Sequence, residues 1–185
     1  MDYIIKFLEG KNIYLPPYNE KRDLELFQFG KNNIKVRDTL FLFRPVSEQD
    51  TITEAKEWHS NKENALFTIC EQDSNEPIGE TGLFRIDFIS RAAIFYIAIY
   101  DPQYWSKGYG GEATDSVLKY SFDILNLNRV QLHVAANNLH GVKMYKKFGF
   151  VIEGTLREAM YHNNEYVDFF VMGILRKDYY RNTSS

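Results

Sequence analysis

The most restrictive part of this 185-residue chain is an apolar run that leads through a glycine-rich turn into a helical pattern. The run "AAIFYIAIY" (92–100) is apolar at consecutive positions, which predicts a strand in the middle of a sheet, covered on both faces. The turn "DPQYWSKGYGG" (101–111) follows, and apolar residues then recur at helical spacing from Ala113 onward. The fold must therefore join a central strand to a helix through three glycines: Gly108, Gly110 and Gly111.

A glycine-rich turn before a helix predicts an anion site. The first N–H groups of a helix have no acceptor within it, and the helix dipole adds positive potential there. Phosphate groups bind such ends, and glycine lets the main chain come close because it has no Cβ. Two nucleotide motifs are rejected: Lys107 precedes the glycines instead of following them as in a P-loop, and Ala113 takes the third position of G-x-G-x-x-G. A helix start without a ligand is the alternative.

Hydrophobic spacing and turn residues predict the other elements. Strands are expected over 11–15, 65–72, 76–90, 91–100 and 129–138, with a hairpin within 151–175. Helices are expected over 19–32, 47–61, 111–125 and 140–149, the second of them capped by Ser47. This order predicts the α/β (α+β) class, with a mixed, mostly antiparallel sheet of about six to seven strands and helices on both faces. One domain is expected over 1–185, with 1–10 and 181–185 peripheral.

Composition excludes several function classes. A net charge of −3 argues against a nucleic-acid partner, which needs clustered Lys and Arg. The single cysteine, Cys70, excludes a disulfide framework and a Cys-rich zinc site, and no histidine pair has metal-ligand spacing. The longest apolar run is too short to cross a membrane as a helix, and the start lacks a signal-peptide pattern. The expectation is a cytoplasmic protein without a metal.

Two stretches in the second half carry a family resemblance. They are "IAIYDPQYWSKGYGGEA" (97–113) and "ANNLHGVKMYKKFGF" (136–150), and the second places Asn138 and Tyr145 before a Gly-Phe pair. Together they resemble the GNAT family of acetyl-CoA-dependent N-acetyltransferases. Within it, the chain is similar to the branch of ribosomal-protein N-terminal acetyltransferases (RimJ/RimL type) and spermidine acetyltransferases. The resemblance is strongest over 85–175.

The resemblance implies acetyl-CoA as co-substrate and assigns the residues that bind it. The strand over 91–100 is expected to splay from the strand over 129–138, so that its main chain pairs with pantetheine, and Asn138 corresponds to the asparagine that also bonds this arm. Trp105 departs from the family pattern, which usually has Gln or Arg there. The cofactor-binding set is Ile97, Ala98, Ile99, Lys107, Gly108, Tyr109, Gly110, Gly111, Glu112, Ala113, Asn138 and Tyr145.

Acetyl transfer needs a general acid for the leaving thiolate and a neutral attacking amine. The resemblance places Tyr145 at the general-acid tyrosine, and a phenol is protonated at neutral pH. Glu80 is the candidate base because it lies on a strand from which side chains reach the cleft. Tyr96 and His133 also lie on central strands, and water alone is a further alternative.

The implied function is transfer of the acetyl group to a primary amine by direct attack in a ternary complex. The expected acceptor is a protein or peptide N-terminus or a small amine. Spermidine or another polyamine is an alternative, which Ile94 weakens because the spermidine branch usually has a carboxylate there. A non-catalytic CoA-binding sensor or interaction module is the other alternative. Exposed strand edges near the C-terminal hairpin make a homodimer a further expectation.

Overall fold

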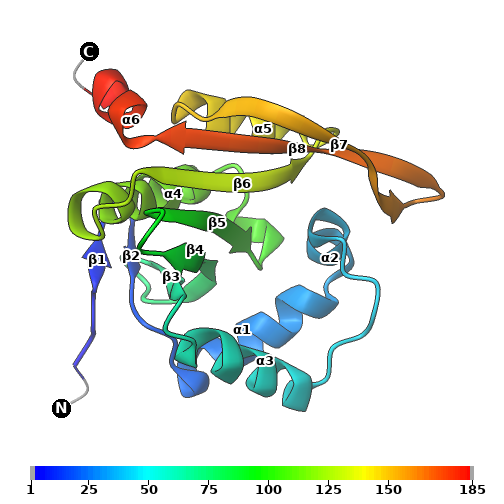
Figure 1. Ribbon diagram of the computed structural model, residues 1–185. Helices are drawn as coiled ribbons and strands as arrows, with labels where there is room; N and C mark the ends of the chain where they lie inside the picture. The colour runs from blue at the N-terminus through cyan, green and yellow to red at the C-terminus, as the bar shows by residue number, and fades with distance from the viewer. Residues whose placement is uncertain (1–2, 184–185) are drawn as a thin grey trace. The chain divides into compact units, whose positions relative to one another are not determined.

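The computed structural model describes residues 3–183, which form two compact units (Figure 1). The first contains residues 3–84 and 96–117, and the second contains residues 85–95 and 118–183. Hydrogen bonding orders the strands as β1-β2-β3-β4-β5-β6-β8-β7 in a mixed sheet. The predicted α/β class is confirmed, with eight strands instead of six to seven. Residues 1–2 and 184–185, part of the segments predicted to be peripheral, lie outside the described residues.

The first unit contains antiparallel strands. The additional strand β1 (Leu8–Glu9) pairs with β2 (Ile13–Leu15), which pairs with β3 (Ala65–Glu71), and β3 pairs with β4 (Pro77–Asp87). Strand β5 (Ala92–Ile99) begins in the second unit and ends in the first. The predicted strands within 11–15, 65–72, 76–90 and 91–100 are therefore confirmed.

Helices α1 (Glu20–Asn32) and α3 (Glu48–Ser60) of this unit lie side by side (Figure 1). The predicted cap of α3 is confirmed, because the Ser47 hydroxyl accepts from the Asp50 main-chain N–H at 3.1 Å and the Asp50 carboxylate accepts from the Ser47 main-chain N–H. The hydrogen bonds from Ser47 also lower the pKa of the Asp50 carboxyl. No helix within residues 3–183 is long and apolar enough to cross a membrane.

A helix that the sequence did not predict, α2 (Ile34–Leu40), follows α1 immediately. Asn33 separates them because it is extended, with φ −69° and ψ 126°. Its main-chain N–H donates to Phe29 at the end of α1, while its side chain accepts from the Lys35 N–H at 3.0 Å. One asparagine thus closes one helix and caps the next.

Gly30 lets α1 approach the end of the sheet. A Cβ on Gly30 would lie 2.4 Å from the Cβ of Tyr100 and 2.6 Å from its ring, closer than van der Waals contact allows. Tyr100 is fully buried, in a core with Phe27, Val36 and Ala98. The absent side chain of Gly30 therefore fixes how closely α1 packs on Tyr100.

The second unit carries the predicted hairpin and the last two helices. The start of β5 pairs in parallel with β6 (Arg129–Ala135), which pairs antiparallel with β8 (Glu165–Leu175), and β8 pairs with β7 (Val151–His162). Asn163 and Asn164 form the turn with φ 52° and 68°, as a tight hairpin requires. Helix α5 (Leu139–Lys147) follows β6, and α6 (Arg176–Thr183), which the sequence did not predict, follows β8.

The helix expected over 111–125 starts earlier and changes its winding. Helix α4 (Tyr109–Lys119) begins directly after Gly108, and a π-helical turn over 120–124 continues it. In that turn the Leu125 N–H donates to the Tyr120 carbonyl at 3.0 Å, a bond one residue longer than in an α-helix.

Replacing Gly30 with alanine tests the close approach of α1. Alanine favours a helix by up to about 1 kcal/mol over glycine, but the clash with Tyr100 forces a backbone or ring shift. We expect Gly30→Ala to lower the free energy of unfolding by about 1–3 kcal/mol in urea titrations. The control Gly154→Ala, where nothing lies within 4 Å of the new methyl, should change it by less than about 0.5 kcal/mol. Equal midpoints for the two variants would contradict this role of Gly30.

Candidate functional site

The glycine loop has the geometry of an anion site. Gly108 has φ 91°, a left-handed conformation that favours glycine, and it leads directly into α4. The first main-chain N–H groups of α4 have no acceptor within the helix, and they point toward the loop. The positive end of the helix dipole lies at the same place. The ammonium of Lys107, an exposed residue, lies 5.1 Å from the ring centre of Tyr104. A diphosphate fits this arrangement of N–H groups, dipole and lysine.

The Glu112 carboxylate is bound to the start of β2. It accepts from the Asn12 main-chain N–H and from the Asn12 amide, each at 2.8 Å, and from the Ile13 N–H at 3.4 Å. The Glu112 main-chain N–H donates to the Gly108 carbonyl at 3.0 Å. The side chain thus joins β2 to the first turn of α4.

The end of β5 is held by Trp105, the residue that departs from the family pattern. Its indole N–H donates to the Ile99 carbonyl at 3.0 Å, and its ring packs on the core around Phe27 and Tyr100. The Tyr100 N–H donates to the Ile78 carbonyl at 2.9 Å. Trp105 therefore fixes the last main-chain carbonyl of the predicted pantetheine-binding segment.

In the second unit, α5 carries the two other predicted residues. The side-chain oxygen of Asn138 caps α5 by accepting from the Gly141 N–H at 2.9 Å. The ring of Tyr145 meets Phe95 and Phe150 edge to face, with centroids 6.2 and 5.8 Å away. Burial raises the pKa of Tyr145 to about 12, so its hydroxyl stays protonated at neutral pH.

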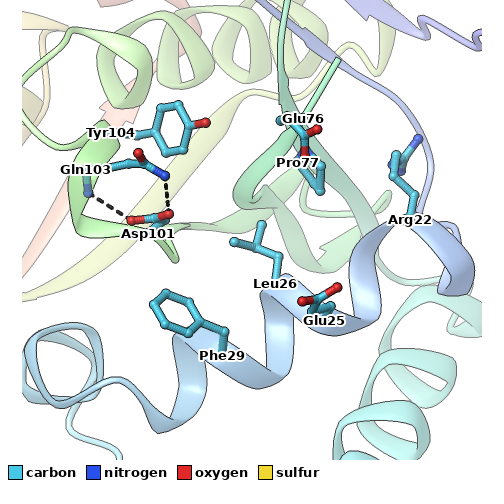
Figure 2. Close-up of a pocket in the computed structure, with 9 residues that line it drawn as sticks. All are labelled: Arg22, Glu25, Leu26, Phe29, Glu76, Pro77, Asp101, Gln103 and Tyr104. Carbon is cyan, nitrogen blue, oxygen red and sulfur yellow. Dashed lines mark hydrogen bonds between the residues drawn. The ribbon is translucent and has the colours of Figure 1, made fainter. Parts of the chain in front are cut away.

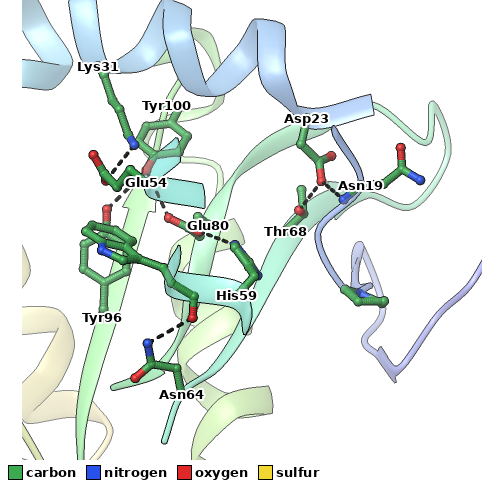
Figure 3. A network of polar contacts seen from close by, with 12 residues as sticks. Asn19, Asp23, Lys31, Glu54, His59, Asn64, Thr68, Glu80, Tyr96 and Tyr100 are labelled. Carbon is green, nitrogen blue, oxygen red and sulfur yellow. Dashed lines mark hydrogen bonds and ion pairs between the residues drawn. The ribbon is translucent and has the colours of Figure 1, made fainter. Parts of the chain in front are cut away.

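The predicted base, Glu80, belongs to a buried polar network of the first unit (Figure 3). Its Oε1 lies 2.8 Å from His59 Nε2, and its Oε2 accepts from the Tyr100 hydroxyl at 3.2 Å. The Tyr96 hydroxyl lies 3.3 Å from that of Tyr100. The Glu80 side chain is only 2% exposed, so it does not meet a substrate directly, whereas Tyr96 is half-buried.

Two members of this network, Tyr100 and His59, were not singled out from the sequence. Tyr100 directly follows β5, four positions after Tyr96, so the alternation of a strand puts both side chains on the same face. His59 lies on α3, twenty-one residues before Glu80, and only the packing of α3 on the sheet brings the two together. No local sequence pattern predicts the contact between His59 and Glu80.

A cavity of about 350 Å³ lies between α1 and the segment after β5 (Figure 2). Apolar side chains and three carboxylates line it. Arg22, the one cation among its lining residues, is ion-paired with the buried Asp23. The remaining lining residues are Glu25, Leu26, Phe29, Glu76, Pro77, Asp101, Gln103 and Tyr104.

Comparison with known proteins identifies the family. The model of the acetyltransferase (GNAT) domain matches residues 12–151. The chain belongs to the GNAT acetyltransferase family. It is 35% identical over 162 residues to a spermidine N(1)-acetyltransferase of Vibrio cholerae, covering 86% of this chain and 91% of the relative. A probable N-acetyltransferase of Bacillus subtilis, YjcK, is 28% identical and covers 92% of this chain and 98% of its own length.

The solved structures agree with this family assignment. The crystal structure of the spermidine N-acetyltransferase from Vibrio cholerae in complex with CoA and spermine matches with a TM-score of 0.83 and 30% sequence identity, over 91% of this chain and 98% of that chain. The 185-residue protein is thus a GNAT enzyme that transfers an acetyl group from acetyl-CoA to an amine, as the resemblance implied. That assignment favours an enzyme over the alternative of a non-catalytic module.

Replacing Trp105 with phenylalanine tests the contact at the end of β5. The aromatic ring stays, but the Ile99 carbonyl loses its indole donor. We expect the free energy of unfolding to fall by about 1 kcal/mol more than in Trp58→Phe, because no indole hydrogen bond is recorded for Trp58 in the described residues. Urea titrations of both variants measure this difference. A smaller loss in Trp105→Phe would show that the hydrogen bond contributes little.

Proposed function

We propose that the acetyl acceptor of this enzyme is a small polyamine, a flexible chain with several ammonium groups. The observation that carries the proposal is the similarity to the spermidine N(1)-acetyltransferase of Vibrio cholerae, at 35% identity over 86% of this chain. The cavity in the first unit supports it, since Glu25, Glu76 and Asp101 line the cavity and its lining arginine is neutralised by Asp23. Carboxylates beside apolar walls suit alternating ammonium groups and methylenes.

A peptide or protein N-terminus is the second candidate. Ile94, half-buried on β5, replaces the carboxylate that the spermidine branch usually carries in this segment. A single primary amine with an apolar neighbour needs fewer carboxylates than a polyamine does. The two candidates therefore differ in how strongly the rate should depend on acidic residues and on salt.

A release assay for free CoA thiol separates these acceptors. At fixed acetyl-CoA we expect a kcat/KM for spermidine at least about tenfold above that for a tripeptide with a free N-terminus. Glu25→Gln and Glu76→Gln should each raise the KM for spermidine about two- to fivefold, whereas Glu57→Gln, an exposed α3 residue outside the cavity, should not. A preference for the peptide, with KM indifferent to Glu25 and Glu76, would favour the N-terminal amine.

We assign the acetyl-CoA contacts residue by residue from the family pattern. Of the segment 108–113, the main-chain N–H groups before Glu112 bind the diphosphate, with Lys107 adding charge, and the main chain of 97–99 binds the pantetheine arm. Asn138 uses its side-chain oxygen for the α5 cap, which leaves its Nδ2 donors for the cofactor. Glu112 acts only by holding the loop in this proposal, because its carboxylate is bound to Asn12 and its main-chain N–H donates to the Gly108 carbonyl. Bound acetyl-CoA supplies the activated acyl group.

We propose Tyr145 as the general acid that protonates the leaving sulfur. Its raised pKa keeps the proton on the phenol, and Phe95 and Phe150 orient the ring. Glu80 is the proposed proton acceptor for the amine. The homodimer and the cytoplasmic location remain predictions; the exposed side chains along β7 support the first of them.

Replacing Tyr145 with phenylalanine removes the proposed acid and keeps the ring contacts. We expect kcat to fall about 10²-fold with an unchanged acetyl-CoA affinity. Because the phenol stays protonated up to about pH 12, deprotonation of this group should not reduce the rate of the parent enzyme through about pH 10. The control Tyr3→Phe, at an exposed tyrosine, should match the parent. An undiminished kcat in Tyr145→Phe would remove this residue from the mechanism.

A further inference from the structure

Tyr104 lies where the cavity assigned to the acceptor approaches the glycine loop. It is the last residue of a short 3-10 turn (Pro102–Tyr104) that follows β5, and it lines the cavity (Figure 2). The Asp101 carboxylate holds this turn by accepting from the Gln103 main-chain N–H at 2.9 Å and from the Gln103 side-chain amide at 2.6 Å. The ring of Tyr104 therefore has a defined place beside both proposed substrate sites.

Carboxylates lie around this ring. Burial raises the pKa of Tyr104, and the negative charges of Asp101, Glu71 and Glu76 raise it further, as expected for carboxylates close to the phenol. Asp101 and Glu76 also line the cavity. The face of an aromatic ring attracts cations, and neighbouring carboxylates strengthen that attraction. The ring of Tyr104 is thus suited to an ammonium group.

An ammonium group of the protein already lies over this ring. The Lys107 Nζ is 5.1 Å from the centre of the Tyr104 ring. The residues on either side of Lys107, Ser106 with φ 60° and Gly108 with φ 91°, are both left-handed, so the main chain bends before and after the lysine. Lys107 is exposed, and no salt bridge is recorded for it within residues 3–183. Its ammonium can therefore leave the ring without breaking an ion pair.

Lys107 also belongs to the proposed diphosphate site, because it directly precedes Gly108 and the first turn of α4. A cation–π contact at an exposed position is weaker than a charge-assisted hydrogen bond to a phosphate. Lys107 should therefore prefer a bound diphosphate to the Tyr104 ring. One lysine thus faces the proposed sites of both substrates.

We propose that Lys107 couples the two substrate sites through Tyr104. Without acetyl-CoA, the Lys107 ammonium occupies the Tyr104 ring and opposes the entry of a second cation into the cavity. When a diphosphate is bound, Lys107 pairs with it and leaves the ring to the ammonium group of the acceptor. The inference rests on the proposed function and adds Tyr104 to the residues that bind the amine.

Titration calorimetry measures this coupling without turnover. Spermidine is titrated into the protein alone and into the protein saturated with CoA, which has no acetyl group to transfer, and CoA is titrated with and without spermidine. We expect CoA to lower the Kd for spermidine about fivefold or more, and the reverse titration should give the same factor because coupling is reciprocal. Pairing of spermidine with CoA in solution is measured separately and is the same for every variant.

Lys107→Gln removes the ammonium that occupies the ring. Without CoA, this variant should bind spermidine about two- to fivefold more tightly than the parent, and its coupling factor should fall at least about threefold. Lys21→Gln is the matched control, because Lys21 is an exposed lysine of α1 that does not line the cavity. It corrects for the loss of one positive charge and should keep the coupling factor of the parent.

Variants of Tyr104 test whether the ring carries the effect. Tyr104→Leu removes the ring that holds Lys107, so the coupling factor should fall as in Lys107→Gln, while the Kd for CoA alone stays within about twofold of the parent. Tyr104→Phe keeps the ring and should keep the coupling. In the double variant the loss should not exceed that of Lys107→Gln alone, because both changes act on one contact.

The outcomes separate failure of the coupling from failure of the proposed acceptor. Equal spermidine affinities in Lys107→Gln and Lys21→Gln, or an undiminished coupling factor in Tyr104→Leu, would overturn the coupling while acetylation of spermidine stands. If spermidine does not bind and only a tripeptide with a free N-terminus is acetylated, the acceptor proposal fails, and the same titrations with that tripeptide test the coupling. A coupling that is lost in Tyr104→Leu and kept in Tyr104→Phe supports the inference with either amine.

Discussion

Glu80 is a carboxylate that the first unit buries almost completely, and a charge of that kind has to be compensated where it lies. Removing one partner from a buried ion pair typically costs about 3–5 kcal/mol, so its neighbours are part of the fold as much as of the site. His59 comes from α3, and Tyr100 is held by the close approach of α1 at Gly30. The packing of α1 and α3 and the hydrogen bonding of this one buried side chain are therefore coupled in this unit.

The features that the sequence predicted correctly depend on local stereochemistry. Gly108 supplies a left-handed conformation at a helix start, Ser47 and Asp50 form a capping box, and Asn163 and Asn164 turn the hairpin. Each of these is decided within a few residues, where main-chain sterics and one or two hydrogen bonds outweigh everything else. The family motifs extend this reach because their order along the chain stands for a known arrangement.

The features that escaped prediction depend on contacts between distant segments. The sequence predicted one helix followed by a loop, but Asn33 ends α1 and starts a second helix, α2. No apolar periodicity marks this short helix. In the sequence, Trp105 is visible only as a departure from the family pattern. In the structure its indole N–H donates to the Ile99 carbonyl and so holds the end of β5. His59 could be any surface histidine until α3 is placed on the sheet. Periodicity reports which face of an element is covered but does not identify the residue that covers it.

The first unit holds carboxylates in two environments, and each suits a different step of amine acetylation. Those that line the cavity are accessible to water, so they attract an ammonium group over a distance of about one Debye length but hold it weakly and in competition with salt. Glu80 is shielded from water, and its two carboxylate oxygens are contacted by the His59 ring and by the Tyr100 hydroxyl. An amine has to be bound as a cation and to react as a neutral base. Under the proposed function, separate carboxylates would let the enzyme recognise the charge of the amine without using the same group to take its proton.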